Sequence, residues 1–132
     1  MDTQSNIDDQ EHLAGPQDHT LFYLQSNAAQ ALAQFTQSLQ ACLDCADIRR
    51  YYPLQLTLTL DAYVLVEESR GDKARIEHLL NIDPTIVAQL REIEVLHRMV
   101  YQLTHRLEAC VDTFHFGLTS IGGMVFFTKE NG

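Results

Sequence analysis

A hydrophobic residue recurs every seven positions along residues 84–118, which predicts one long amphipathic helix. The recurring positions are Ile86, Ile93, Val100, Leu107 and Phe114, with Leu96, Leu103 and Cys110 three places after three of them. Asp83 suits the position before the helix, and Pro84 suits its first turn, where a missing N–H costs no hydrogen bond. At about 1.5 Å per residue this helix would be roughly 50 Å long, so other segments must cover its hydrophobic side.

Residues 19–46 carry a second seven-residue pattern and predict a second long helix. The shared positions are Leu21, Ala28, Phe35 and Cys42, with Leu24, Ala31 and Cys45 three places later. Residues 1–18 show no such period and contain few large hydrophobic side chains. We therefore predict a disordered acidic tail over residues 1–18, followed by a single helical domain over residues 19–132.

Residues 54–68 fit two interpretations. Leu54, Leu56, Leu58 and Leu60 alternate with Gln and Thr, as in a strand. Pro53 nevertheless suits the start of a helix, and a hydrophobic stretch of this length is ordinary for a buried helix. A strand pair here would also need a further strand, which only residues 123–129 offer. We favour the helix.

Together with a short helix over residues 73–80, these segments predict an all-α fold. It would be a small helical bundle of three long helices and one short one, the last long helix being the C-terminal heptad helix. The alternative is an α+β fold in which residues 54–68 and 123–129 form a small antiparallel sheet.

The formal net charge is −9, and seven acidic residues but no basic ones precede Arg49. This charge argues against nucleic acid as a partner, because such proteins bind mainly by neutralising phosphates. No hydrophobic run reaches the roughly 20 residues of a membrane-spanning helix, and the N-terminus has no basic or hydrophobic targeting region. We expect a soluble, cytoplasmic protein without a membrane partner.

The cysteines and histidines offer candidate metal chemistry that the pattern does not favour. Cys42-x-x-Cys45 has the spacing of a metal or redox pair. Both thiols fall on the hydrophobic side of a predicted helix, as does Cys110, and buried Cys packs as a small hydrophobic residue. Glu94-x-x-His97 resembles half of a di-iron helical site, but the sequence holds no second copy on another long helix. We expect no metal and no cofactor.

Arg98 and His105 are separated by six residues, a spacing that resembles the Arg-x(4–6)-His motif of HEPN-type helical ribonucleases. The resemblance implies an enzyme in which these two residues act on RNA. Both positions, with Arg91 and Asp112, fall opposite the hydrophobic side of the predicted long helix, where side chains face water. We therefore expect no enzyme, and a helical metal-binding protein or a HEPN-like ribonuclease remains an alternative.

The predicted long helix and the residues after it carry more hydrophobic side chains than one helical face can hold. This excess favours a protein-interaction module. The candidates for a partner or dimer interface are Met99, Phe114, Phe116, Leu118, Met124, Val125, Phe126 and Phe127. We expect a non-catalytic adaptor, secretion-type chaperone or regulatory subunit that binds a protein partner of unknown identity and forms a homodimer. An acidic inhibitor that mimics DNA is a further alternative.

Overall fold

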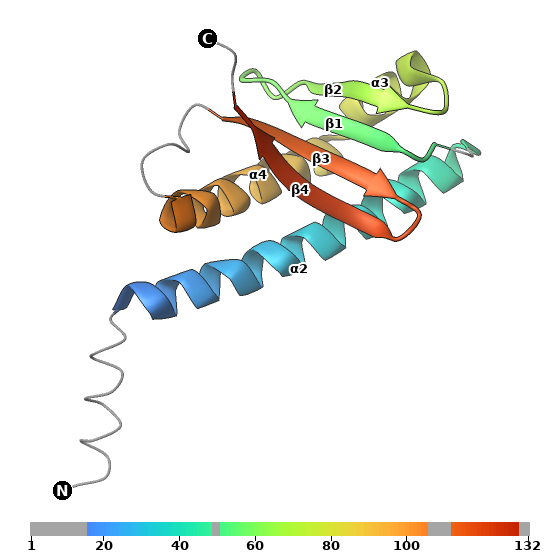
Figure 1. Ribbon diagram of the computed structural model, residues 1–132. Coiled ribbons are helices and arrows are strands. Elements are labelled where there is room, and N and C mark those ends of the chain that lie inside the picture. Colours follow the sequence, from blue (N-terminus) through green and yellow to red (C-terminus); the bar gives the residue numbers. More distant parts are fainter. Residues whose placement is uncertain (1–15, 49–50, 106–111, 130–132) are drawn as a thin grey trace, which may run out of the picture.

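The structure is a computed structural model that describes residues 16–48, 51–105 and 112–129. Within these residues the chain forms three helices and a four-stranded antiparallel sheet (Figure 1). In chain order the elements are α2 (Pro16–Cys45), β1 (Leu54–Leu58), β2 (Val64–Ser69), α3 (Lys73–Asn81), α4 (Pro84–His105), β3 (Thr113–Thr119) and β4 (Gly122–Thr128). The fold is therefore α+β.

The sheet joins two hairpins that lie far apart in the sequence. Its strand order is β2-β1-β3-β4, so the first strands of the two hairpins pair with each other in the middle. Leu56 of β1 lies opposite Val66 of β2 on one side and Phe116 of β3 on the other. Helices α2 and α4 cover one face of this sheet (Figure 1).

The prediction of an all-α bundle was wrong, and the α+β alternative agrees with the structure. Residues 54–58 and 64–69 form two strands rather than one buried helix. The alternation of Leu54, Leu56 and Leu58 with polar residues was the decisive signal, since all three leucines are buried beneath the sheet. The further strands that this hairpin needs come from residues 113–119 and 122–128.

The predicted helix over residues 84–118 correctly begins at Pro84 but is too long. Helix α4 is described to His105, and Thr113 begins a strand. Phe114 fell on the seven-residue pattern by coincidence, because Phe114, Phe116 and Leu118 follow the two-residue period of a strand. Leu107 and Cys110 lie outside the described residues.

The boundary of the predicted tail also changes. Helix α2 begins at Pro16, so residues 16–18 belong to the helix, whereas residues 1–15 lie outside the described residues.

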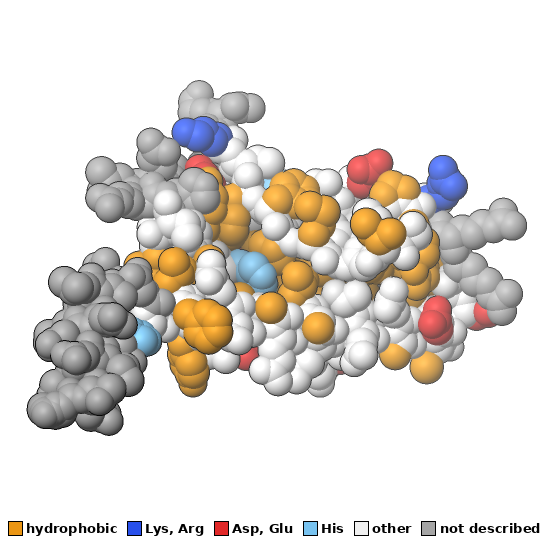
Figure 2. Space-filling view, turned by 60° about the horizontal axis from the view of Figure 1, so that its bottom comes forward, with side chains coloured by type: hydrophobic (Ala, Val, Ile, Leu, Met, Phe, Trp, Pro, Cys, Tyr) orange, Lys and Arg blue, Asp and Glu red, His pale blue; other side chains and the backbone are white. Residues whose placement is uncertain are grey.

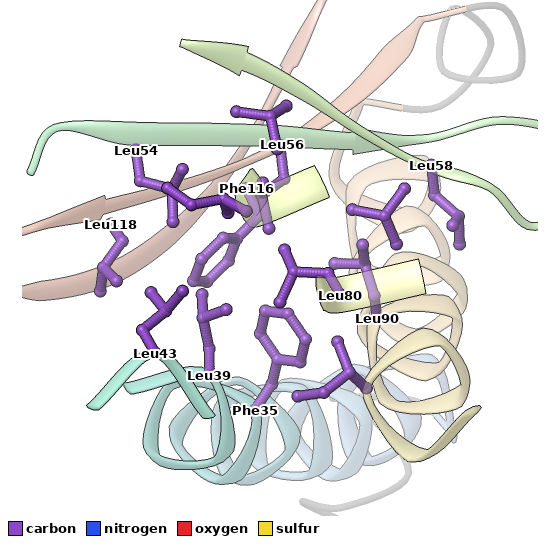
Figure 3. Close-up of a cluster of buried hydrophobic side chains, with 14 of the residues drawn as sticks. Phe35, Leu39, Leu43, Leu54, Leu56, Leu58, Leu80, Leu90, Phe116 and Leu118 are labelled. Carbon is purple, nitrogen blue, oxygen red and sulfur yellow. The ribbon is translucent and has the colours of Figure 1, made fainter. Parts of the chain in front are cut away.

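The hydrophobic core lies between the sheet and the helices (Figure 3). Phe35, Leu39 and Leu43 of α2 are fully buried and face Phe116 and other residues of the sheet. Each such side chain contributes roughly 1.5–3 kcal/mol by leaving water. The rings of Phe35 and Phe116 meet edge to face, with centroids 4.9 Å apart. This contact joins helix α2 to the centre of the sheet.

Helix α3 closes the outer edge of strand β2. The Asn81 side chain accepts a hydrogen bond from the Val64 N–H at 2.8 Å and donates one to the Val64 carbonyl at 2.9 Å. The Glu77 carboxylate accepts a bond from the Val66 N–H at 2.9 Å, which lowers the pKa of Glu77. Side chains therefore occupy the backbone groups that a neighbouring strand would otherwise use.

Helix α2 approaches the sheet most closely at Gly123 of β4. A Cβ atom at Gly123 would lie 2.4 Å from Oγ1 of Thr36 and 2.8 Å from Cε1 of Phe116. Any larger residue must therefore push the helix or the Phe116 ring away. At Gly117 the nearest side-chain atoms would lie at 3.5 and 3.6 Å, which is ordinary contact.

We predict that Gly123→Ala lowers the free energy of unfolding by about 1–3 kcal/mol, because it overpacks the contact between α2 and the sheet. The matched control Gly117→Ala should change it by less than about 0.5 kcal/mol. Urea denaturation of the two variants checks both values. Equal losses in both would show that α2 does not approach β4 in this way.

Candidate functional site

The predicted interface residues divide into two groups. Phe114, Phe116 and Leu118 are at most 2% exposed, so they belong to the core of the chain itself. The residues that keep exposed surface are Met99, Met124, Val125, Phe126 and Phe127. Met99 lies on the outward side of α4 with 42% of its surface exposed. The other four lie together on β4, which makes this strand the first candidate.

Strand β4 is an edge strand whose outward backbone groups can be identified. In an antiparallel sheet, alternate residues point their N–H and C=O groups to opposite sides. The Thr57 hydroxyl of β1 donates to the Phe114 carbonyl at 2.6 Å. The backbone groups of the even-numbered residues of β3 therefore point towards β1, and those of the odd-numbered residues point towards β4. Met124 and Phe126 lie opposite odd-numbered residues of β3, so their backbone groups point towards β3. The backbone groups of Val125 and Phe127 point away from the sheet.

The closed edge of β2 supports this assignment independently. The backbone N–H groups of Val64 and Val66 point outward there, since they bond to side chains of α3. The backbone groups of Leu56, which lies opposite Val66, must then point towards β3. Those of its partner Phe116 must point towards β1. Among the described residues, the β2 edge is thus covered by α3, whereas β4 has β3 as its one neighbouring strand.

A groove lies beside the open edge of β4. Its volume is about 460 Å³, within the range of ligand-binding pockets. It is lined by Gln25 of α2, by His97, Val100, Tyr101 and Thr104 of α4, and by Val125, Phe126 and Phe127 of β4. Figure 2 shows the molecule from below the view of Figure 1, with a band of hydrophobic side chains and a histidine across the middle of this face. None of the described residues that line the groove is Asp, Glu, Lys or Arg.

His97 gives this groove one polar group of defined character. Its Nδ1 lies 2.8 Å from the Ile93 carbonyl oxygen, which can only accept a hydrogen bond. Nδ1 therefore carries the proton, and Nε2 is the acceptor of the neutral ring. Burial lowers the pKa of His97, although the bond to Ile93 opposes this effect. The groove is thus hydrophobic, uncharged and equipped with a hydrogen-bond acceptor.

Tyr101 of α4 and Phe127 of β4 meet in the wall of the groove. Their rings stack with centroids 4.6 Å apart, and the Tyr101 hydroxyl donates to the Asp112 carboxylate at 2.7 Å. The Arg98 guanidinium lies 5.1 Å from the centroid of the Phe127 ring, within the range of a cation–π contact. These contacts fix the position of the Phe127 ring, so part of the groove is already formed before anything binds.

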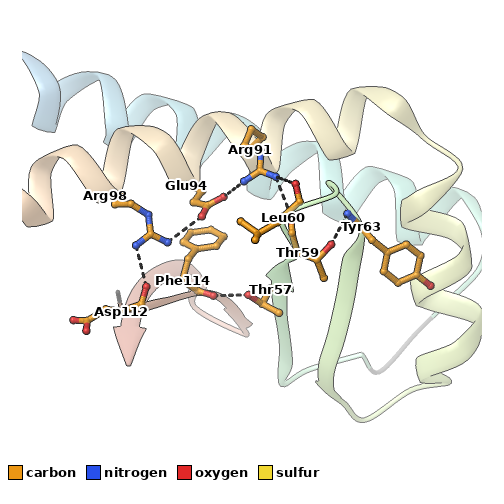
Figure 4. A network of polar contacts seen from close by, with 9 residues as sticks. All are labelled: Thr57, Thr59, Leu60, Tyr63, Arg91, Glu94, Arg98, Asp112 and Phe114. Carbon is orange, nitrogen blue, oxygen red and sulfur yellow. Dashed lines mark hydrogen bonds and ion pairs between the residues drawn. The ribbon is translucent and has the colours of Figure 1, made fainter. Parts of the chain in front are cut away.

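Arg91, Arg98 and Asp112 do not line the solvent side of α4, so that prediction was wrong. The Glu94 carboxylate pairs with both guanidinium groups (Figure 4). Arg91 donates to the Thr59 carbonyl at 3.0 Å, and Arg98 donates to the Asp112 carbonyl at 2.9 Å. This network fastens α4 to the β1–β2 turn and to the start of β3. Arg98 thus serves as a structural link, and the side chain of His105 lies outside the described residues.

A second histidine, His115, lies on the sheet face opposite the helices. Its Nδ1 is 2.7 Å from the Glu67 carboxylate and its Nε2 is 2.7 Å from the Thr128 hydroxyl. Gln55 also donates to Glu67, so the four residues connect all four strands. A carboxylate, an imidazole and a hydroxyl in this order activate the nucleophile of serine hydrolases. The Phe126 ring stacks on the imidazole, and we interpret the group as a polar contact that joins the strands.

The cysteine pair lies in another groove, of about 650 Å³, between α2 and the junction of α3 and α4. Cys45 is exposed, which contradicts its predicted burial, and Cys42 is partly buried. Burial raises the pKa of the Cys42 thiol, and Asp83 raises it further, which keeps the thiol protonated. The described residues contain no group of three or more His, Cys, Asp or Glu side chains that could hold a metal ion.

Two further expectations concern DNA mimicry and the membrane. Four of the acidic residues on which a DNA mimic would depend, Asp2, Asp8, Asp9 and Glu11, precede Pro16 and lie outside the described residues. No helix in the described part of the chain has the length and hydrophobicity to cross a membrane.

Comparisons of this chain with protein-family models, with curated proteins and with solved structures found no match.

The position of His97 was the main feature of the site that the sequence reasoning missed. In the sequence, His97 stands out only as half of a Glu-x-x-His metal element. Its place four residues after the buried Ile93 is the signal for an inward-facing, partly buried histidine on α4.

We predict that His97 makes folding stability fall in acid. Its folded pKa is lower than its unfolded value of about 6.5, so the unfolded chain binds the proton more readily. The contribution of His97 is therefore fully present above about pH 6.5 and is lost as the pH falls towards the folded pKa. Urea unfolding from about pH 8 to about pH 5 should show a smaller loss for His97→Gln than for the unchanged protein. If the free energy of unfolding fell equally with pH in His97→Gln and in the unchanged protein, the burial of His97 would be contradicted.

Proposed function

We propose that this protein is a non-catalytic interaction module that binds a hydrophobic segment of a partner protein in the groove beside β4. The observation that carries the proposal is that, among the residues placed by the structure, a hydrophobic groove without Asp, Glu, Lys or Arg borders a strand edge that no other strand covers. Such binding would suit an adaptor, a secretion-type chaperone or a regulatory subunit. In the cytoplasm, the free thiols of Cys42 and Cys45 would remain reduced.

The polar residues support an interaction role because their contacts serve the fold. Arg91, Glu94 and Arg98 fasten α4 to its neighbours, and His115 joins strands on the opposite face. The groove itself offers the His97 ring and the Gln25 amide among hydrophobic side chains, while the hydroxyls of Tyr101 and Thr104 already donate hydrogen bonds within the chain. This lining suits the recognition of hydrophobic side chains and of peptide N–H donors.

The proposal is tested by panning a displayed library of random peptides against the purified chain. We expect enriched peptides to be rich in hydrophobic residues and to lose affinity by more than about tenfold for Val100→Glu, which places a charge in the groove. The matched control is Met99→Glu, one residue away on the outward side of α4, and it should leave affinity unchanged. Fluorescence anisotropy with the synthesised peptides gives the dissociation constants.

Circular dichroism melting must show that both variants keep the unchanged protein's fold. Failure to enrich any peptide would overturn the proposed function. Equal binding to the unchanged protein and to folded Val100→Glu would also overturn it, because the groove would then not be the binding site.

A further inference from the structure

We infer that the partner segment binds in an extended conformation, as an antiparallel strand added to the edge of β4. This inference rests on the proposed function and specifies how the groove recognises its partner. The sheet would then join the four described strands of this chain to one strand of the partner.

The backbone of β4 supplies the first part of the recognition. Val125 and Phe127 point their N–H and C=O groups away from β3, as the register of the sheet requires. An added strand would bond to these groups and would remove an uncovered edge. On β2, by contrast, Asn81 and Glu77 already occupy the corresponding groups of Val64 and Val66. Within the described part of the chain, the edge of β4 is therefore open to strand addition, whereas the edge of β2 is occupied.

The groove supplies the second part. Residues that lie opposite each other in an antiparallel pair place their side chains on the same face of the sheet. Val125 and Phe127 direct their side chains towards the helices, where both contact the core. The partner residues that bond to them would therefore direct their side chains into the groove between α2 and α4. The same residues of the partner make the hydrogen bonds and fill the groove, which favours antiparallel over parallel addition.

A second copy of this chain fits the edge less well. Pairing of two β4 strands about Val125 would place Gly123 of one copy opposite Phe127 of the other. Glycine has no side chain to fill the groove beside Phe127. A foreign segment with a large hydrophobic residue at this position would fill it, so we assign the edge to a partner rather than to a homodimer.

Charge defines the partner segment further. The described residues of the groove lining include no Asp, Glu, Lys or Arg, and burial disfavours a charged His97. The residues that enter the groove must therefore be uncharged. Because the chain has a formal charge of −9, a partner with basic residues beside the segment is favoured over an acidic one. The predicted ligand is an extended segment with hydrophobic residues at alternate positions and basic flanks.

A short peptide of alternating valine and threonine, with lysine at each end, is the probe. The test compares it with two N-methylated forms, because N-methylation removes a donor without removing a side chain. Methylation of the valine nitrogens, which face β4, should weaken binding by more than about tenfold, whereas methylation of the threonine nitrogens should leave it within about twofold. Fluorescence anisotropy measures the three affinities.

The variant Val125→Pro tests the same bond from the protein side. Proline removes the outward N–H of Val125 and is tolerated on an edge strand, so the ladder to β3 is kept. We expect a loss of affinity of about fivefold or more for the unmodified peptide. The control Met124→Thr changes an exposed side chain of β4 on the face away from the groove and should bind normally.

The outcomes separate this inference from the proposed function. If selected peptides bind and respond to Val100→Glu, but valine methylation has no effect, the function stands and strand addition is overturned. If threonine methylation is the damaging change, addition is parallel and the inference is again overturned. Light scattering decides the role of a second copy. A mass of twice 15.0 kDa that Val125→Pro reduces to 15.0 kDa would assign the edge to a homodimer and would also overturn the inference.

Discussion

The close packing of helix α2 against the sheet at Phe116 is the constraint on which the other features depend. Phe35 meets the Phe116 ring edge to face, a geometry that adds about 0.5–1.5 kcal/mol to the burial of the two rings. Gly123 lets Thr36 approach the neighbouring strand β4. Helix α2 therefore lies against the hairpin end of β4. At the other end of β4, Phe126 and Phe127 border the groove with the last turns of α4.

The two edges of the sheet differ because, among the described residues, side chains of α3 bond to the backbone of β2, whereas none bonds to the outward backbone groups of β4. Helix α3 follows β2 after a short turn, and its Asn81 and Glu77 side chains satisfy the outward groups of β2. Strand β4 has a hydrophobic sequence without charge or proline, the residues that proteins commonly use to protect an edge. Such an edge is costly for a protein to leave uncovered unless it serves recognition, and this difference links the fold to the proposed function.

The sequence predicted some of these elements well and others poorly, for identifiable physical reasons. Asp83 and Pro84 correctly marked the start of α4, and the seven-residue repeat that includes Phe35 correctly identified α2. Both succeeded because helix caps and helical periodicity are local signals. The β-sheet was rejected because the partner of a strand lies far away in the sequence. Phe114 fitted both a heptad and a strand, and its strand role becomes apparent only when β1 and β4 are known. Edges and grooves depend on this pairing, so no local pattern could reveal His97 as part of a groove.

Amide hydrogen exchange along β4, followed by NMR, tests the open edge most directly. The account predicts that the N–H groups of Val125 and Phe127 exchange with solvent much faster than those of Met124 and Phe126, which bond to β3. At the closed edge, the N–H groups of Val64 and Val66 should exchange slowly, because Asn81 and Glu77 accept from them. Slow exchange at Val125 and Phe127 in the free protein would show that the edge is already covered, and would contradict the account.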